Sequence, residues 1–536
     1  MQMRWQRFMV AGLAVAVVAV GGCGGGAKSD TGGEQKGTGT QTASGPKSGG
    51  TLKVGISRDP LAFDGHIAYG ITNSSVLGNI YDGLVEYDMP GDGKIVGALA
   101  ESWTMPDDKS YVFKIRQGVT FHNGDPFDAH VAEWNLKRIM DPQTAATRRG
   151  ELTAMIDKID VPDDYTLKVT LKQPSPIFLN VLAAREVYMM DQKWVAAGND
   201  PKKSAMGTGP FKLKSYEPQR NVILVKNENY WKKGLPYLDQ LDMEVLQDDA
   251  ARVNAFKGNE VNFIEYVPWQ EFQGFEADKS LKLTKGFDSF NVVRLNPNRA
   301  PFDNPKVRQA INYVVDREEI INLAWGGQGL PITGGMLQQS SPYYNADLQG
   351  VWKKDWDKAR ALLKEAGINN PADVKLTLET STLSVHKDTA QVVLQELQQF
   401  GFKVEYKTFE FQTTVDKRSS GDYQMLVDGL GMSWPDPDFY FQYFHSTGSG
   451  HAKGVKMKVD ALDKLIEQGR TTVDPAMRKP IYHDLEKGIV DNAPWIFLLW
   501  RPQAEVTHDF VMGYKPLPGG IAGYSIGYLE YVWLNK

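Results

Sequence analysis

The chain has 536 residues and a mass of 59.8 kDa, enough for roughly two to four domains. Hydrophobic residues make up 42% of it, charged residues 23% and aromatic residues 11%, values that exclude a disordered or fibrous chain. The net charge of −5 comes from charges of both signs spread along the chain, so nucleic acid is not an expected partner. The single cysteine excludes an intramolecular disulfide and a cysteine-based zinc site.

Residues 1–22 have the pattern of an export signal. Arg4 and Arg7 precede an apolar stretch from Phe8 to Gly22, which is shorter than the about 20 residues of a membrane-spanning helix. Two small residues stand directly before Cys23, an arrangement that resembles the lipobox of bacterial lipoproteins. The resemblance implies cleavage before Cys23 and lipidation of that residue, and the alternative is an ordinary secretory signal with a chance cysteine.

Residues 23–50 are expected to form a flexible tether. Ten of the 27 residues after Cys23 are glycine, and only Ala27 and Ala43 are hydrophobic. Such a segment cannot bury enough surface to offset its ordering entropy.

The lipid anchor predicts an exported protein held at the cell membrane, facing the periplasm or the cell exterior.

The remaining chain shows the periodicities of a mixed α/β body. Alternating apolar residues predict strands at 51–57, 111–115, 167–171 and 241–245. Asn304 and Pro305 begin a helix that we expect over 304–324, and a second helix ends at Gly367. Residues 100–200 carry further strands, separated by turns rich in proline and aspartate.

The clearest unit covers residues 374–408. A strand leads into an amphipathic helix that stops at Gly401, and a second strand follows at once. This order predicts a βαβ unit and hence a parallel sheet with helices on its faces. We expect the 304–324 helix and the segment 422–428 in the same lobe.

The sequence contains no catalytic motif of the metalloprotease, P-loop, serine-hydrolase or dinucleotide-binding type. The eight histidines are scattered and are expected at the surface or in supporting positions. Asp436-Pro437-Asp438 lacks the dense oxygen spacing of a calcium loop. We therefore expect no enzyme activity, no catalytic residues, no metal site and no cofactor.

Several stretches, in order along the chain, resemble the family 5 extracellular solute-binding proteins, the oligopeptide, dipeptide and nickel-binding group that serves ABC importers. These stretches are 79–85 (NIYDGLV), 100–103 (AESW), 113–116 and 119–124 (FKIR and VTFHNG), 207–211 (GTGPF), 295–311, 359–367 (ARALLKEAG) and 433–438 (SWPDPD).

The resemblance implies an α/β fold of the periplasmic-binding-protein-like type II, with two main lobes around a ligand cleft and an extra subdomain on the first lobe. Lobes of this kind close over a ligand by a hinge motion. The expected boundaries are lobe I at 51–90, 205–300 and 506–536, the extra subdomain at 91–204 and lobe II at 301–505. The C-terminal stretch 506–536 is expected to return strands to an earlier sheet.

The resemblance also gives ligand-binding candidates. In peptide-binding relatives an aspartate four residues before the proline of an acidic-Pro motif pairs with the peptide ammonium, whereas this chain has the neutral Ser433 there. A serine offers a weaker hydrogen bond than a charged group does. Asp436 or Asp428 are possible substitutes, and Trp434 could stack on a ligand or cap the lobe core.

Three other residues remain open. Arg294 follows a strand-like run at the expected lobe crossing, where it would suit a carboxylate or form a surface salt bridge. Tyr69 lies in a turn-rich segment that often faces the cleft in relatives. Asn296 is expected to cap a turn, and His445 has no context that supports nickel binding.

These observations predict a monomeric substrate-binding lipoprotein of an ABC transporter. It would capture peptides or peptide-like solutes outside the cytoplasmic membrane and deliver them to the permease subunits. The same scaffold binding an oligosaccharide or a metal chelate is one alternative, and a secreted hydrolase or a structural envelope lipoprotein is another.

Overall fold

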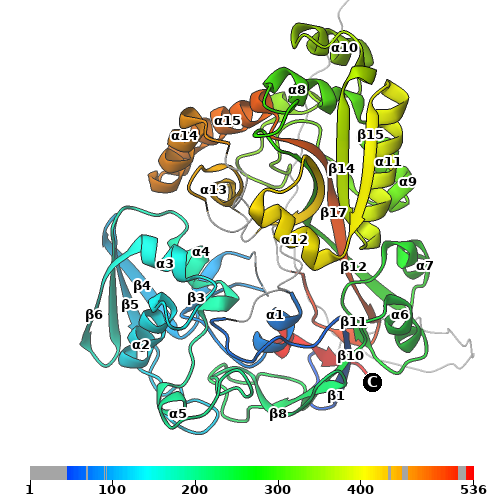
Figure 1. Ribbon diagram of the computed structural model, residues 1–536. Coiled ribbons are helices and arrows are strands. Elements are labelled where there is room, and N and C mark those ends of the chain that lie inside the picture. The colour runs from blue at the N-terminus through cyan, green and yellow to red at the C-terminus, as the bar shows by residue number, and fades with distance from the viewer. Residues whose placement is uncertain are drawn as a thin grey trace, which may run out of the picture. The chain divides into compact units, whose positions relative to one another are not determined.

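The computed structural model describes residues 45–67, 71–89, 91, 93–432, 436–448, 457–516 and 527–536. The predicted signal segment, Cys23, Tyr69, Ser433 and Trp434 lie outside the described residues. Within them, one eleven-stranded mixed sheet, one four-stranded antiparallel sheet and two pairs of short strands form the β structure (Figure 1).

The large sheet has the strand order β15-β14-β16-β12-β17-β11-β1-β10-β9-β8, and β13 pairs with β17 outside this path. Its strands are β1 (Thr51–Ile56), β8 (Phe211–Glu217), β9 (Asn221–Lys226), β10 (Gln240–Val245), β11 (Phe263–Ile264), β12 (Leu281–Leu295), β13 (Leu330–Pro331), β14 (Lys375–Ser381), β15 (Lys403–Phe409), β16 (Met425–Gly431) and β17 (Trp495–His508). Strands from both ends of the chain therefore share one sheet.

The four strand predictions are confirmed. β1 runs parallel to β10 from Thr51 opposite Gln240 to Ile56 opposite Val245. Leu52, Val54 and Ile56 are fully buried on one face of β1, so the period-two pattern marks the side that packs into the core. The other two predicted strands lie in the small sheet.

The four-stranded sheet has its own core, formed within residues 84–189. Its strands, in sheet order, are β4 (Ala100–Asp107), β5 (Ser110–Ile115), β7 (Thr166–Leu171) and β6 (Ile156–Asp163). The neighbouring elements are β2 (Val85–Tyr87), β3 (Ile95–Gly97), α2 (Ala129–Met140), α3 (Arg149–Met155), α4 (Phe178–Leu182) and α5 (Gln192–Ala196). The expected domain boundaries remain a prediction.

The predicted βαβ unit is confirmed. β14, α11 (Ser384–Phe400) and β15 follow one another, and the strands pair in parallel from Lys375 opposite Lys403 to Ser381 opposite Phe409. Gly401 ends α11 with a φ of 117°, a left-handed conformation that favours glycine. Figure 1 shows α11 and α9 (Arg317–Trp325) beside these strands.

The expectation of one helix over 304–324 is wrong. The chain forms α8 (Pro305–Val314) and α9, and Val315 between them is extended with a φ of −91° and a ψ of 129°. The Asp316 side chain accepts hydrogen bonds from the backbone N–H groups of Glu318 and Glu319, so it starts a new helix. The buried Arg317 guanidinium holds the break by donating to the carbonyls of Asn312 and Val315.

The expectation that the C-terminal stretch adds strands to an earlier sheet is largely wrong. Val506 and Thr507 do pair with β11, but they belong to β17. The later strands β18 (Val511–Met512) and β19 (Trp533–Leu534) pair only with each other among the described strands. Each is two residues long, so hydrophobic packing holds this segment: Val511, Leu529 and Val532 join the core that contains β1 and β10.

A buried ion cluster also holds the C-terminal segment. The Lys232 ammonium lies 2.8 Å from a Glu86 carboxylate oxygen and 3.2 Å from Glu530 Oε1. Burial raises the pKa of Glu86 to about 7. The positive charge of Lys232 opposes this rise, and the negative charge of Glu530 adds to it. The cluster therefore joins β2, the segment after β9 and the C-terminal segment through side chains alone.

The other helices are α1 (Ile71–Leu77), α6 (Asp249–Lys257), α7 (Phe272–Ala277), α10 (Trp356–Glu365), α12 (Phe411–Ser420), α13 (Phe439–Phe444), α14 (Asp460–Thr471) and α15 (Pro475–Asn492). α10 confirms the second predicted helix, and Gly367 follows its end with a φ of 83°. None of the helices in the described ranges combines the length and apolar character needed to cross a bilayer.

Candidate functional site

Two long antiparallel strands, β12 and β17, connect separate hydrophobic cores. They pair from Leu281 opposite His508 to Arg294 opposite Trp495, with register shifts after Gly286 and after Asn291. At one end, Ala504 and Val506 pack with residues of α6 and α7. At the other end, the same strands enter the cores that contain the βαβ unit and α13–α15. The middle of these two strands is therefore the junction of the fold.

Three polar residues alternate along β17 at this junction: Arg501, Gln503 and Glu505. Alternate residues of a strand lie on one face, and we call these three the β17 polar row. Ala504 and Val506, on the opposite face, are fully buried in an apolar core. Gln503 is 3% exposed and Glu505 is 2% exposed, so the row is itself withdrawn from solvent.

Gln503 is buried with its hydrogen-bonding capacity unmet. Neither its side-chain oxygen nor its side-chain nitrogen has a hydrogen-bonding partner among the described residues. Leaving a buried polar group unpaired costs about 1–3 kcal/mol. An unpaired buried amide of this kind is free to bind a water, an ion or a ligand, and Gln503 offers both a donor and an acceptor at the junction.

Glu505 lies in an acidic environment. Burial raises its pKa well above the ordinary value, and the nearby carboxylates of Asp288 and Glu265 raise it further, while Tyr514 acts in the opposite direction. The Glu265 carboxylate is held in place by Ser57, whose backbone N–H and hydroxyl donate to Oε1, and by Ser75, whose hydroxyl donates to Oε2. This end of the row therefore favours a positively charged group.

Arg501 stands at the other end of the row, half-buried and with neither an ion pair nor a hydrogen bond of its side chain in the described part of the chain. Burial raises the pKa of Tyr266, and the Arg501 charge opposes that rise. Burial also lowers the pKa of His386, to about 4. The charges of Arg501 and Arg418 add to this decrease, whereas the charge of Asp428 opposes it. Tyr266 follows β11, and His386 follows β14. Arg501 thus acts on groups from both sides of the junction and favours an anionic partner.

Arg294 lies near the end of β12 and is 3% exposed. Its Nε donates to Asp428 Oδ2 at 2.7 Å, and its guanidinium carbon lies 4.8 Å from the centre of the Trp495 ring. The Arg418 guanidinium donates to the other Asp428 oxygen at 3.2 Å. The alternative of a surface salt bridge is therefore wrong, because the pair is buried.

Arg294 also borders a small pocket. Its lining includes four aromatic residues, Tyr423, Tyr443, Phe444 and Trp495, together with His445 and Met457. His445 is buried and hydrogen-bonds Glu467 through its Nε2 at 3.3 Å. Asn296, close by along the chain, accepts from the backbone N–H of Asn298, which is the expected turn cap.

Asp436 forms a two-pronged ion pair with Arg478, and both of its oxygens lie 2.8 Å from a guanidinium nitrogen. Asp428 is engaged by Arg294 and Arg418. The two carboxylates that could replace the aspartate absent at position 433 are therefore both neutralised by arginines.

The histidines were expected at the surface or in supporting positions, and several of them occupy buried positions rather than the surface. His66, His386, His445 and His508 are buried. His66 hydrogen-bonds the Tyr188 carbonyl through Nε2 at 2.8 Å, and burial is the main reason that its pKa falls to about 4. Such a neutral imidazole serves packing and hydrogen bonding, which periodicity could not reveal.

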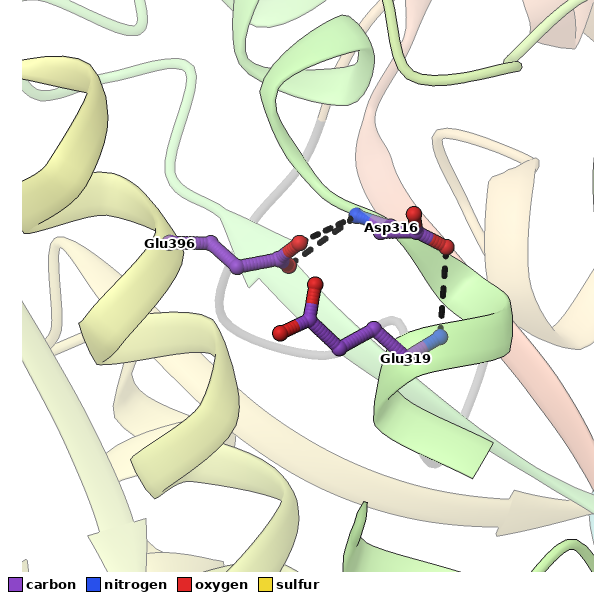
Figure 2. Close-up of side chains that lie close together, drawn as sticks. All are labelled: Asp316, Glu319 and Glu396. Atoms are coloured by element: carbon purple, nitrogen blue, oxygen red, sulfur yellow. Dashed lines mark hydrogen bonds between the residues drawn. The ribbon is translucent and has the colours of Figure 1, made fainter. Parts of the chain in front are cut away.

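Asp316, Glu319 and Glu396 bring three carboxylates close together (Figure 2). Each has another partner. Asp316 caps α9, and Glu396 accepts two hydrogen bonds from the Asp316 backbone N–H, at 2.8 and 3.0 Å. The Lys354 ammonium lies 3.0 Å from Glu396 and 3.5 Å from Glu319, so a lysine already supplies the positive charge that a metal ion would bring.

The candidates from the sequence thus separate into two groups. Arg294 and Asp436 are both described, and each is held in an ion pair, whereas Tyr69, Ser433 and Trp434 lie outside the described residues. The β17 polar row was missed, although residues 500–506 (WRPQAEV) carry a signal for it. Polar residues alternate there with apolar ones in a strand whose other face is buried.

Comparisons with known proteins add three findings. The family model of the bacterial extracellular solute-binding proteins, family 5, matches residues 94–451. A curated relative, the glutathione-binding protein GsiB of Pectobacterium atrosepticum, is 29% identical over 491 residues, which cover 88% of this chain and 93% of the relative. Further curated proteins of the same name reach 30% identity, among them that of Escherichia coli K12, where the match covers 87% of this chain and 92% of the relative.

Solved structures are similar over most of the chain. The binding protein AgaA of A. tumefaciens R10, in complex with agropinic acid, matches with a TM-score of 0.80 and 31% identity, covering 91% of this chain and 99% of AgaA. The ABC transporter-associated periplasmic binding protein DppA of Helicobacter pylori, in complex with the peptide STSA, matches with a TM-score of 0.79 and 25% identity. That match covers 91% of this chain and 99% of DppA.

Proposed function

Because this chain belongs to the bacterial extracellular solute-binding proteins, family 5, we propose that it captures a peptide or peptide-like solute outside the cytoplasm and delivers it to the permease subunits of an ABC transporter. Its α/β fold is of the type II periplasmic-binding-protein kind, with two main lobes. The family consists of binding components, and we propose no catalytic step for this member.

The β17 polar row is the observation that carries the ligand proposal. It combines an end that favours a cation at Glu505, an end that favours an anion at Arg501 and an unpaired amide at Gln503 between them. Relatives bind glutathione and the peptide STSA, by their names and titles. Both of these ligands carry an ammonium group, at least one carboxylate and amide groups. A neutral oligosaccharide has neither an ammonium group for Glu505 nor a carboxylate for Arg501.

Native mass spectrometry of the purified full-length chain tests this function. Proteins that close over a ligand retain it through a gentle purification, so we expect adducts whose masses differ by amino-acid residues. Gln503→Leu should weaken binding of the identified ligand about 10-fold, because one or two amide hydrogen bonds are lost. Gln412→Leu, which changes an exposed glutamine of α12, is the control. Adducts spaced by hexose masses would contradict the peptide proposal.

We propose that a lipid on Cys23 anchors the protein to the cell membrane. Cys23→Ser should move the protein from the membrane fraction to the soluble fraction, because the substituted residue cannot form the thioether to the lipid. Fractionation followed by immunoblotting measures the distribution, with the unchanged chain as the control. Retention of the Cys23→Ser variant at the membrane to the same extent as the unchanged chain would contradict the anchor.

A further inference from the structure

We propose that the β17 polar row measures the length of the ligand. In this arrangement Glu505 receives the ammonium group of a tripeptide- or tetrapeptide-sized zwitterion, Gln503 binds its backbone and Arg501 binds its carboxylate. The inference rests on the proposed function and adds the class of solute, its orientation and its length.

The acidic end is built to hold a cation. Asp288, from the register shift of β12, and Glu265, which follows β11, both act on the Glu505 carboxyl group. The neutral Tyr514 side chain, from the C-terminal segment, lowers the pKa of Glu505. A ligand ammonium entering this environment forms charge-assisted hydrogen bonds, which are about twice as strong as neutral ones. The other charged residue of the row, Arg501, would repel the amine and lies at the opposite end.

The carboxylates nearer to position 433 do not compete for the amine. Asp436 is paired with Arg478, and Asp428 is paired with both Arg294 and Arg418. Moving either carboxylate to a ligand would leave a buried arginine uncompensated, which is costly. Glu505 is therefore the carboxylate that we assign to the ligand ammonium, rather than Asp436 or Asp428.

The centre of the row matches a peptide backbone. The Gln503 side chain offers both a carbonyl acceptor and an N–H₂ donor, and both are buried and unpaired within the described residues. A peptide group presents the complementary N–H and C=O. One amide group of the ligand would thus satisfy both atoms.

The spacing of the row sets the length. A strand rises about 3.3 Å per residue, so the four steps from Arg501 to Glu505 span roughly 13 Å. An extended peptide covers at most about 3.3–3.6 Å per residue, so three residues reach roughly 10 Å and four reach roughly 14 Å. A dipeptide would leave one end unpaired, and a hexapeptide would place its carboxylate beyond Arg501.

The experiment offers the full-length chain six peptide libraries of equal complexity and reads the bound masses by native mass spectrometry. The libraries contain dipeptides, tripeptides, tetrapeptides, hexapeptides, N-acetylated tripeptides and tripeptide C-terminal amides. We expect tripeptides to be retained at least about 10-fold better than the N-acetylated tripeptides, since acetylation removes the charge that Glu505 binds. Tripeptides should also be retained better than their C-terminal amides, since amidation removes the carboxylate that Arg501 binds. Dipeptides and hexapeptides should be retained less than tripeptides and tetrapeptides.

Two variants and one control connect these preferences to the row. Glu505→Gln keeps the size of the side chain and should abolish the preference for a free amine. Arg501→Met should abolish the discrimination between tripeptides and their C-terminal amides. Thr507→Val changes a residue on the same face of β17, beyond the row, and should leave both preferences unchanged. Circular dichroism confirms that each variant is folded.

A second readout is the proton balance. Burial raises the pKa of Glu505 in the free chain, and a bound ammonium favours the ionised carboxylate, so binding shifts this carboxyl group towards ionisation. Binding of the best-retained tripeptide should release a proton, measured by calorimetry in buffers of different ionisation enthalpy. Glu505→Gln should remove that release.

The outcomes separate the two proposals. Equal retention of dipeptides, tripeptides, tetrapeptides and hexapeptides would overturn the length-measuring role and leave peptide capture standing. Equal retention of free and acetylated tripeptides, or an unchanged amine preference in Glu505→Gln, would overturn the assignment of the amine to Glu505 and with it this inference. Retention of none of the six libraries would overturn the peptide function together with this inference.

Discussion

Asp428→Asn will lower the free energy of unfolding by about 3–5 kcal/mol at pH 7, because it leaves two arginines facing a neutral amide in a buried site. Asp428 accepts from Arg294 at 2.7 Å and from Arg418 at 3.2 Å. Burial raises the pKa of Asp428, and the two arginines outweigh burial, so its pKa lies below the ordinary value. Urea unfolding followed by tryptophan fluorescence measures the loss.

The pH dependence of this loss has a definite sign. A carboxyl group whose pKa is lowered in the folded chain stabilises it above the unfolded pKa of about 3.9 and loses that effect as the pH falls through the folded pKa. Asp428→Asn and the unchanged chain should therefore converge only in strong acid. Asp422→Asn is the matched control: its carboxylate also pairs with two cations, Arg299 and Lys417, but is itself exposed, so each pair is expected to contribute less than about 1 kcal/mol. Equal losses for both variants would contradict the argument.

Lys232→Met will destabilise the chain by about 3–5 kcal/mol at pH 8, since it removes the cation that pairs with two glutamates in a buried cluster. The ammonium contacts Glu86 at 2.8 Å and Glu530 at 3.2 Å. The loss should be smaller at pH 5 than at pH 8. Glu86, with a pKa of about 7, is already protonated at pH 5, so the removed lysine faces less negative charge there.

Urea unfolding at the two pH values measures this difference. Lys257→Met serves as the control, because its pair with Glu271 is half-exposed and should contribute less than about 1 kcal/mol. A loss for Lys232→Met that is larger at pH 5 than at pH 8 would show that the two glutamates are not the source of the effect.

Local patterns were sufficient to predict much of the fold. The alternation of Leu52, Val54 and Ile56 identified β1, and the stop at Gly401 identified the βαβ unit, because both signals depend on neighbours within a few residues. The break at Asp316 was missed although the sequence holds its cause: an aspartate followed three residues later by Glu319 is typical of a helix start. The pairing of β18 with β19 depends on packing between distant segments, and periodicity does not carry that information.

The site was less predictable for the same reason. Asp436 and Arg478 are 42 residues apart, so the sequence could not show that Asp436 is neutralised. Gln503 and Glu505 stand out only once the face of β17 opposite Ala504 and Val506 is known. Their alternation was visible in the sequence, but a polar strand face reads as solvent-exposed, and only the structure shows that it is buried and that Gln503 is unpaired among the described residues.

The place of β17 also sets an order of events during folding. This strand lies between β12 and β11 in the large sheet, yet it ends at His508 of a 536-residue chain. A central strand therefore completes the sheet, and it does so only after nearly the whole chain has been synthesised. Pairing between such distant segments is slow. A nascent chain that lacks β17 cannot complete the large sheet.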